Sequence, residues 1–191
     1  MSREMDSIIK SIIIMKIGFH VNEMIEEIIN RKQKEQSICG KIFWGYSGML
    51  CNPLTQINPF VQEMIEKHNM VPLLVMILTP SRFTTSLRIA QEYSTDGKTW
   101  TSLPPGVIVT SSKYAIVCHN LKLVDQELDL SRYKVATGIR KGELLSRYLR
   151  HRIDKACAIF WNTNNLSPVK PELTKINYIA NLQEPYAVIL R

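Results

Sequence analysis

Apolar and polar positions along the first half of the chain predict strands separated by amphipathic helices. Residues 41–44 suit a buried strand, with three consecutive apolar residues after Lys41. Apolar residues then recur at the spacing of one helical face: Ile57, Phe60, Val61, Met64 and Ile65. Asn52-Pro53 and Asn58-Pro59 each combine a favoured helix cap with a proline suited to the first turn. The pattern predicts a buried strand, a glycine-bracketed loop at 45–48 and a helix.

The alternation extends to both sides of this unit. Residues 15–19 suit a first strand, whereas residues 2–15 fit a helix or a strand equally well. A helix is expected from about 22 to 35, with Arg31, Lys32 and Lys34 near its end to complement the helix dipole. Residues 71–78 are continuously apolar, as in a strand covered on both faces. The order strand, helix, strand, helix, strand predicts a parallel sheet with right-handed crossovers.

The next part of the chain predicts short antiparallel strands. Residues 87–93 and 98–103 flank Asp96-Gly97, a strong hairpin signal. The segment Ser94-Thr-Asp-Gly-Lys-Thr-Trp100 resembles the Asp-box hairpin of sialidase-type propeller blades. Because the resemblance covers one short segment, it implies only a local turn with Trp100 beneath it. Further strands are expected at 107–109, 114–118, 133–137 and 186–190.

A long amphipathic helix is expected from about 141 to 161, followed by a polar loop at 162–171. Its apolar face consists of Leu145, Leu149, Ile153, Ala156 and Phe160, at 3.6-residue spacing. Together the elements predict a single three-layer α/β domain with a partly parallel mixed sheet. Its parts are a βαβαβ-like half at 1–83, an antiparallel β extension at 84–137, and the basic helix with a final strand at 138–191.

Composition places the chain among ordinary globular proteins, with 45% apolar and 21% charged residues in 191. No apolar run reaches the roughly 18 residues that span a bilayer, so no membrane partner is expected. Lys10 and Lys16 interrupt the isoleucine-rich start, and no small-residue cleavage site follows, so a signal peptide is not expected. The four cysteines are far apart and form no CxxC pair, which favours a reducing cytoplasm.

The positive charge is concentrated at one end of the chain. Residues 1–130 hold 13 Lys and Arg against 13 Asp and Glu, and are neutral. Residues 131–191 hold 11 basic and 4 acidic residues, and 11 − 4 gives the whole net charge of +7. This asymmetry predicts a polyanionic partner, nucleic acid or a nucleotide.

The loop between the strand at 41–44 and its following helix is the first candidate site. Strand, tight loop and helix N-terminus commonly form an anion site, here with Gly45, Ser47, Gly48, Cys51 and Asn52. The loop is neither a Walker loop nor a GxGxxG or GxSxG motif. The alternative reading is a turn whose glycines are needed for positive φ.

The second candidate site is the basic segment 131–155, with eight basic and two acidic residues. Glu143 and Asp154 are spaced to pair with two of the arginines, which leaves a large surplus of positive charge. This surplus predicts phosphate contacts, and the alternative is a solvated face. The candidate residues are Arg132, Lys134, Arg140, Lys141, Arg147, Arg150, His151 and Lys155.

Neither a metal nor a cofactor is indicated. The four histidines lack metal-ligand spacing, and nothing converges on the alternating Asp125, Glu127 and Asp129.

The sequence supports three hypotheses about function. The first is a module that binds nucleic acid or a nucleotide. The second is a small enzyme acting on a nucleotide or phosphate-bearing substrate at the loop, using Ser47, Cys51 or His151. The third is a protein-interaction or inhibitor protein of phage or mobile-element type. A protein partner and a homo-oligomer stay open.

Overall fold

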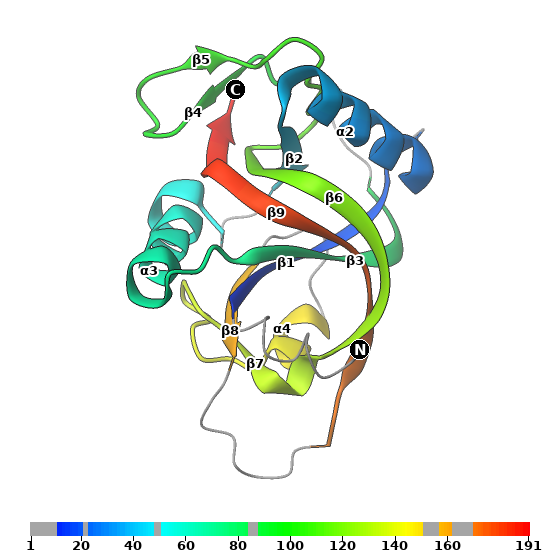
Figure 1. The fold of residues 1–191 in the computed structure, drawn as a ribbon, viewed down its shortest axis with the longest axis vertical. Helices are drawn as coiled ribbons and strands as arrows, with labels where there is room; N and C mark the ends of the chain where they lie inside the picture. The colour runs from blue at the N-terminus through cyan, green and yellow to red at the C-terminus, as the bar shows by residue number, and fades with distance from the viewer. Residues whose placement is uncertain (1–10, 21–22, 48–50, 84–87, 151–156, 162–169) are drawn as a thin grey trace.

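In the part of the chain that the structure describes, nine strands form one curved sheet (Figure 1). The computed structural model describes residues 11–20, 23–47, 51–83, 88–150, 157–161 and 170–191. Its elements in chain order are β1 (Ser11–His20), α2 (Ile25–Cys39), β2 (Ile42–Tyr46), the π-helical turn η1 (Pro53–Ile57), α3 (Asn58–His68), β3 (Leu73–Phe83), β4 (Glu92–Ser94), β5 (Thr101–Ser102), β6 (Tyr114–Asp129), the 3-10 turn η2 (Leu130–Arg132), β7 (Tyr133–Val135), α4 (Leu145–Arg150), β8 (Cys157–Trp161) and β9 (Leu173–Leu190).

The sheet is mixed, in the order β2-β6-β9-β3-β1-β8-β7, with β4 paired to both β9 and β5. β1 and β3 are parallel, and the other pairs of described strands are antiparallel. The predicted α/β class with a mixed sheet is confirmed. The predicted parallel βαβαβ order is wrong, because β2 lies at the sheet edge, where Phe43 pairs with Val117 of the antiparallel β6. An apolar run predicts a buried strand but does not identify its neighbour.

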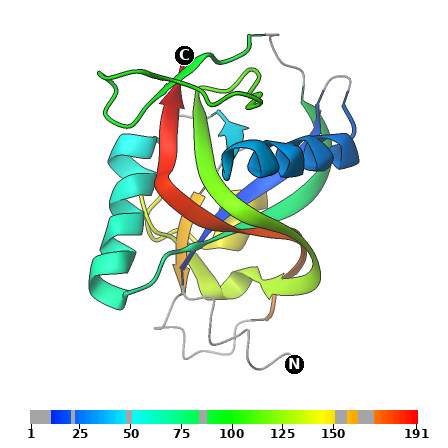
Figure 2. The ribbon, with the colours of Figure 1, turned by 45° about the horizontal axis from the view of Figure 1, so that its top comes forward.

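β6 and β9 lie beside each other over most of their lengths and curve together across the sheet (Figure 2). Register shifts interrupt the pairing between Ile116 and Cys118, between His119 and Lys122, and between Leu123 and Gln126. Irregularities of this kind bend a strand and increase its twist. The strands predicted at 114–118 and 186–190 are therefore the end portions of two much longer strands.

β1 lies between β3 and β8, and its apolar run is buried on both faces. Ile12, Ile13, Ile14 and Met15 are all 0% exposed. A strand covered on both faces needs no alternation of polar and apolar residues, which is why the pattern also fitted a helix. Residues 11–15 are strand, and residues 1–10 lie outside the described ranges.

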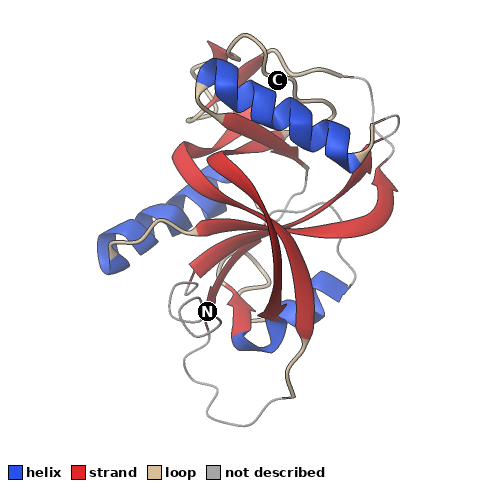
Figure 3. Cartoon of the chain, turned by 45° about the vertical axis from the view of Figure 1, so that its right-hand side comes forward, coloured by secondary structure: helices blue, strands red, loops and turns tan. Residues whose placement is uncertain are grey.

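α2 and α3 lie on the outside of the sheet (Figure 3), whereas α4 lies next to β7 and η2. The predicted second helix is confirmed as α2, although it begins at Ile25, where the backbone N–H of Met24 donates to Glu27 Oε2 at 2.7 Å. Asn22, the expected cap, is outside the described residues. Asn58 does not cap α3. Its side-chain amide instead exchanges hydrogen bonds of 2.9 and 3.0 Å with the backbone of Ala187 in β9, as a neighbouring strand would.

The predicted long helix at 141–161 is wrong. The structure has the short α4 at Leu145–Arg150 and the strand β8 at Cys157–Trp161, which pairs antiparallel with β1 and β7. The segment 157–161 contains isoleucine and two aromatic residues, types that suit a strand, and the edge of β1 opposite β3 provides a partner for it. Residues 151–156 and 162–169, including Ile153 and most of the predicted polar loop, are outside the described ranges.

The hairpin around Asp96-Gly97 is confirmed as β4–β5. Asp96 Oδ1 accepts the backbone N–H groups of Lys98 and Thr99, each at 2.7 Å. Trp100 is half-buried, with the guanidinium of Arg191 4.2 Å from its ring centroid. The strand predicted at 107–109 is wrong, since the nearest pairing there is an isolated bridge between Thr110 and Ile89. The antiparallel strands predicted within 84–137 are present as β4, β5 and β6, and they belong to the main sheet, where β6 lies between β2 and β9.

Candidate functional site

Gly45 lies in β2 rather than in a turn, and its φ is not positive. A Cβ atom there would lie 2.5 Å from Val109 Cγ1 and closer still to Ser112 Oγ. The expectation that Gly45 serves a positive φ is therefore wrong. Glycine is needed at this position because the 109–112 segment packs directly onto the strand. Gly48 is outside the described residues.

Among the described residues of the 45–52 loop, Ser47 and Cys51 also make hydrogen bonds within the protein. Ser47 Oγ donates to the carbonyl of Ser111 and accepts from the N–H of Lys113, both at 3.3 Å. Cys51 is 2% exposed, and its carbonyl accepts the Tyr46 hydroxyl at 2.7 Å. These contacts tie the end of β2 to its surroundings, and they leave neither side chain displayed to solvent as a reactive group.

Asn52 is a helix cap, as predicted. Its Oδ1 accepts the N–H groups of Leu54 at 2.8 Å and Thr55 at 3.3 Å, while its own N–H donates to Gln56 Oε1 at 2.9 Å. These N–H groups would have been the donors for an anion. An anion bound here would have to displace the Asn52 and Gln56 side chains.

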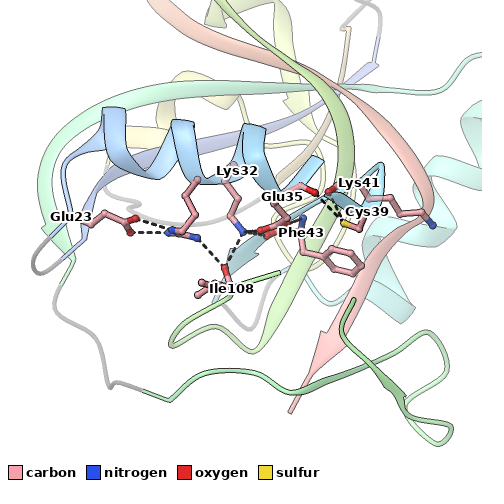
Figure 4. Close-up of polar contacts among 8 residues, drawn as sticks. Glu23, Lys32, Glu35, Cys39, Lys41, Phe43 and Ile108 are labelled. Carbon is pink, nitrogen blue, oxygen red and sulfur yellow. Dashed lines mark hydrogen bonds and ion pairs between the residues drawn. The ribbon is translucent and has the colours of Figure 1, made fainter. Parts of the chain in front are cut away.

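The most deeply buried charges belong to α2, where Lys32 and Glu35 meet the edge of β2 (Figure 4). Lys32 Nζ donates to Glu35 Oε2 at 2.8 Å, to the Phe43 carbonyl at 2.6 Å and to the Ile108 carbonyl at 3.1 Å. Glu35 Oε1 accepts the Phe43 N–H at 2.6 Å. The ammonium thus makes all three of the hydrogen bonds it can donate.

The Lys32–Glu35 pair forms hydrogen bonds with the backbone N–H and carbonyl of Phe43, the two groups that a neighbouring strand would otherwise bond. A sheet edge exposes unpaired N–H and C=O groups, and a covering helix is one way to protect it. Lys32 and Glu35 are 4% and 1% exposed, and burial lowers the pKa of Lys32. Both side chains are therefore part of the packing between α2 and β2 and do not face solvent.

Sequence reasoning missed this pair and assigned Lys32 to the helix dipole. A signal was present, because Lys32 and Glu35 continue the stripe of buried Ile25, Ile28 and Ile29 at helical spacing. Two opposite charges three residues apart on an apolar face are able to neutralise each other when buried. The sequence could not show that Lys32 and Glu35 bond to the backbone of Phe43 and Ile108, because these two residues belong to other segments of the chain.

The described part of the basic segment, residues 131–150, is named here the β7–α4 unit. It contains six basic residues and one acidic residue, a charge of 6 − 1 = +5. Arg132 pairs with Asp129 at 3.2 Å, and Arg140 pairs with Glu143 at 3.5 Å. Lys134 is half-buried in β7, and Lys141 is exposed. His151 and Lys155 lie outside the described residues.

α4 separates its apolar and basic residues sharply. Leu145, Tyr148 and Leu149 are at most 4% exposed, whereas Arg147 and Arg150 are exposed. Within the described part of the chain, neither arginine forms an ion pair. Lys16 Nζ of β1 donates to the Leu149 carbonyl at 2.6 Å and so holds the end of the helix against the sheet.

Comparisons with protein-family models, curated proteins and solved structures find no match to this chain. In the described ranges, no helix is both long and apolar enough to cross a membrane. The same ranges contain no group of three His, Cys, Asp or Glu residues arranged to hold a metal ion.

Proposed function

We propose that the chain binds nucleic acid through the β7–α4 unit. The observation that carries the proposal is the pair Arg147 and Arg150, exposed on α4 and without an acidic partner among the described residues. Nucleic-acid affinity derives largely from basic side chains that neutralise phosphates and release counterions. A unit with a charge of +5 in 20 residues favours such a ligand.

The position of the two arginines on α4 supports phosphate contacts. Residues three apart on a helix are neighbours, with Cβ atoms about 5–6 Å apart, so both guanidinium groups project from one side. A guanidinium binds phosphate through two parallel hydrogen bonds. The buried Leu145, Tyr148 and Leu149 fix the opposite side of the helix, so the arginines need no rearrangement of the fold to meet a ligand.

Arg132 and Arg140 support the proposal less strongly, because each already has a carboxylate partner. Ion pairs at the surface contribute only about 0–1 kcal/mol, so phosphate can compete for these arginines. The 45–52 loop is not part of the proposal, since its described hydroxyl and amide groups are bonded within the protein.

The test replaces both α4 arginines with glutamine, R147Q/R150Q, and measures fluorescence anisotropy with labelled DNA and RNA over a range of salt concentrations. If both arginines contact phosphates, the slope of log affinity against log salt becomes shallower by about 1.4–1.8. The control is K34Q/K98Q, which removes the same charge from exposed lysines outside the unit. Equal slopes for the parent, R147Q/R150Q and the control would refute the proposal.

A further inference from the structure

A loop at the end of β7 displays an apolar side chain to solvent. Residues 138–142, here called the tip loop, form five consecutive exposed positions. Ile139 is 85% exposed, more than any other large apolar residue of the described chain, and Arg140 and Lys141 follow it directly. A single exposed apolar residue is ordinary on a protein surface. Ile139 is informative because of what holds it in place and what surrounds it.

Backbone hydrogen bonds hold the tip loop in one conformation. Val135 N–H donates to the Glu143 carbonyl at 2.9 Å, and Gly142 N–H donates to the Val135 carbonyl at 2.8 Å, which closes the loop at its base. Lys141 N–H donates to the Gly138 carbonyl at 3.1 Å. Gly138 and Gly142 have φ of 73° and 88°, values that glycine adopts without strain. The isoleucine is therefore displayed by an ordered turn.

Arg140 and Lys141 follow Ile139 directly, and the tyrosines of the described β7–α4 unit are not exposed. Proteins that bind single strands commonly stack bases on aromatic side chains. In the β7–α4 unit both tyrosines, Tyr133 and Tyr148, are buried, at 1% and 4% exposed. Duplex-bending proteins instead insert an aliphatic wedge such as isoleucine between base pairs, with basic residues beside it. The residues of the tip loop match the second arrangement.

We infer that Ile139 is a wedge that enters a base step of a nucleic-acid duplex and kinks it, while Arg140 and Lys141 contact the flanking phosphates. This inference rests on the proposed nucleic-acid binding and assigns its ligand class, a duplex with a flexible step. Pyrimidine–purine steps unstack most easily and are the expected sites. The Arg140 side chain is 49% exposed and its contact with the half-buried Glu143 is long, at 3.5 Å, so a phosphate can replace Glu143 as the partner of Arg140.

The test compares I139A with the parent on a duplex that contains one central TA step and carries a fluorophore at each end. Energy transfer between the ends reports bending, and anisotropy reports affinity. I139A is expected to abolish the bend and to weaken binding by about tenfold, from the buried apolar groups that it removes. Its salt slope should equal that of the parent, because no charge is lost.

The matched control is L123A, which shortens another apolar side chain, 74% exposed on β6 and outside the β7–α4 unit. L123A should bind and bend the duplex as the parent does. I139F, which restores a bulky apolar group, should bend it again. Thermal melts of all three variants should match the parent, since both positions are exposed.

Other results would overturn the inference in distinguishable ways. If I139A binds and bends normally while R147Q/R150Q has a shallower salt slope, the wedge is wrong and the proposed function stands. If neither variant differs from the parent, both are wrong. If the parent binds vesicles of anionic phospholipid but not the duplex, and I139A loses that binding, the tip loop contacts a lipid surface instead.

Discussion

Replacing Lys32 with methionine tests whether the buried pair on α2 holds that helix to the sheet. Methionine keeps the length of the side chain and its apolar stem, so the change removes the ammonium with little loss of volume. K32M leaves the Glu35 carboxylate buried with the Phe43 N–H as its one remaining described partner. The carbonyls of Phe43 and Ile108 lose the ammonium as donor.

The expected cost is large because one buried charge is left without its counter-charge. Removal of one member of a buried ion pair costs about 3–5 kcal/mol. This is a large share of the roughly 5–15 kcal/mol that stabilises a typical domain. In K32M/E35M neither charge is left unpaired, although the backbone groups of Phe43 still lose their partners. The double variant should therefore cost at least about 2 kcal/mol less than the sum of K32M and E35M.

Urea unfolding followed by circular dichroism measures these differences in the free energy of unfolding. The control is K67M, which breaks the exposed pair of Lys67 with Glu63, 2.7 Å apart with side chains 65% and 50% exposed. An exposed i,i+4 pair contributes only about 0.3–0.5 kcal/mol. If K32M costs as little as K67M, or if K32M and E35M are additive, then the pair does not act as the internal edge partner of β2.

Two further predictions concern packing and pH. G45A should cost about 1–3 kcal/mol, because its Cβ would overlap the side chains of Val109 and Ser112. V109A removes one of these overlaps, so the cost of the G45A/V109A double variant should be less than additive, and an additive cost would contradict the close approach of Val109. Burial raises the pKa of Asp129, but hydrogen bonds from the Ser131 side chain and from the Glu172 and Ser131 N–H groups, with the charge of Arg132, outweigh it and leave the pKa below its usual 3.8. The folded-state pKa is thus depressed, so ionised Asp129 contributes stability above about pH 4 that is lost as the pH falls through its folded value. Thermal melts should show that the parent has a higher melting temperature than D129N at pH 6 and that this difference shrinks as the pH falls to 3. A difference in melting temperature that stays constant from pH 6 to pH 3 would refute the depressed pKa of Asp129.

Short-range chemistry in the sequence was sufficient for several local features. The Asn52 cap and the Asp96-Gly97 hairpin follow from hydrogen bonds and turn preferences that involve only a few neighbouring residues. The stripe of Ile25, Ile28 and Ile29 was sufficient to predict α2. The concentration of charge after residue 130 is likewise a property of the sequence alone.

Contacts between distant segments decided the rest. Residues 157–161 continued a helical spacing, yet they form β8 because the edge of β1 can accept an antiparallel strand there. β2 pairs with β6, which is about 70 residues away along the chain, and no local pattern encodes that pairing. Neither outcome could be read from periodicity, because periodicity describes one segment and says nothing about the partner that completes its hydrogen bonds.

The candidate site likewise has a part that the sequence predicted and a part that only the fold decided. Sequence identified the basic segment, but only the fold distinguished Arg132 and Arg140, which have carboxylate partners, from Arg147 and Arg150. The fold also placed Lys32, predicted to complement the helix dipole, in a buried hydrogen bond to β2, and it placed Ile139 at an exposed tip. The sequence determines which charges a chain carries. The burial of each charge and its partners depend on contacts between distant segments. Burial and partners together decide whether a charge stabilises the fold or stays available to a ligand.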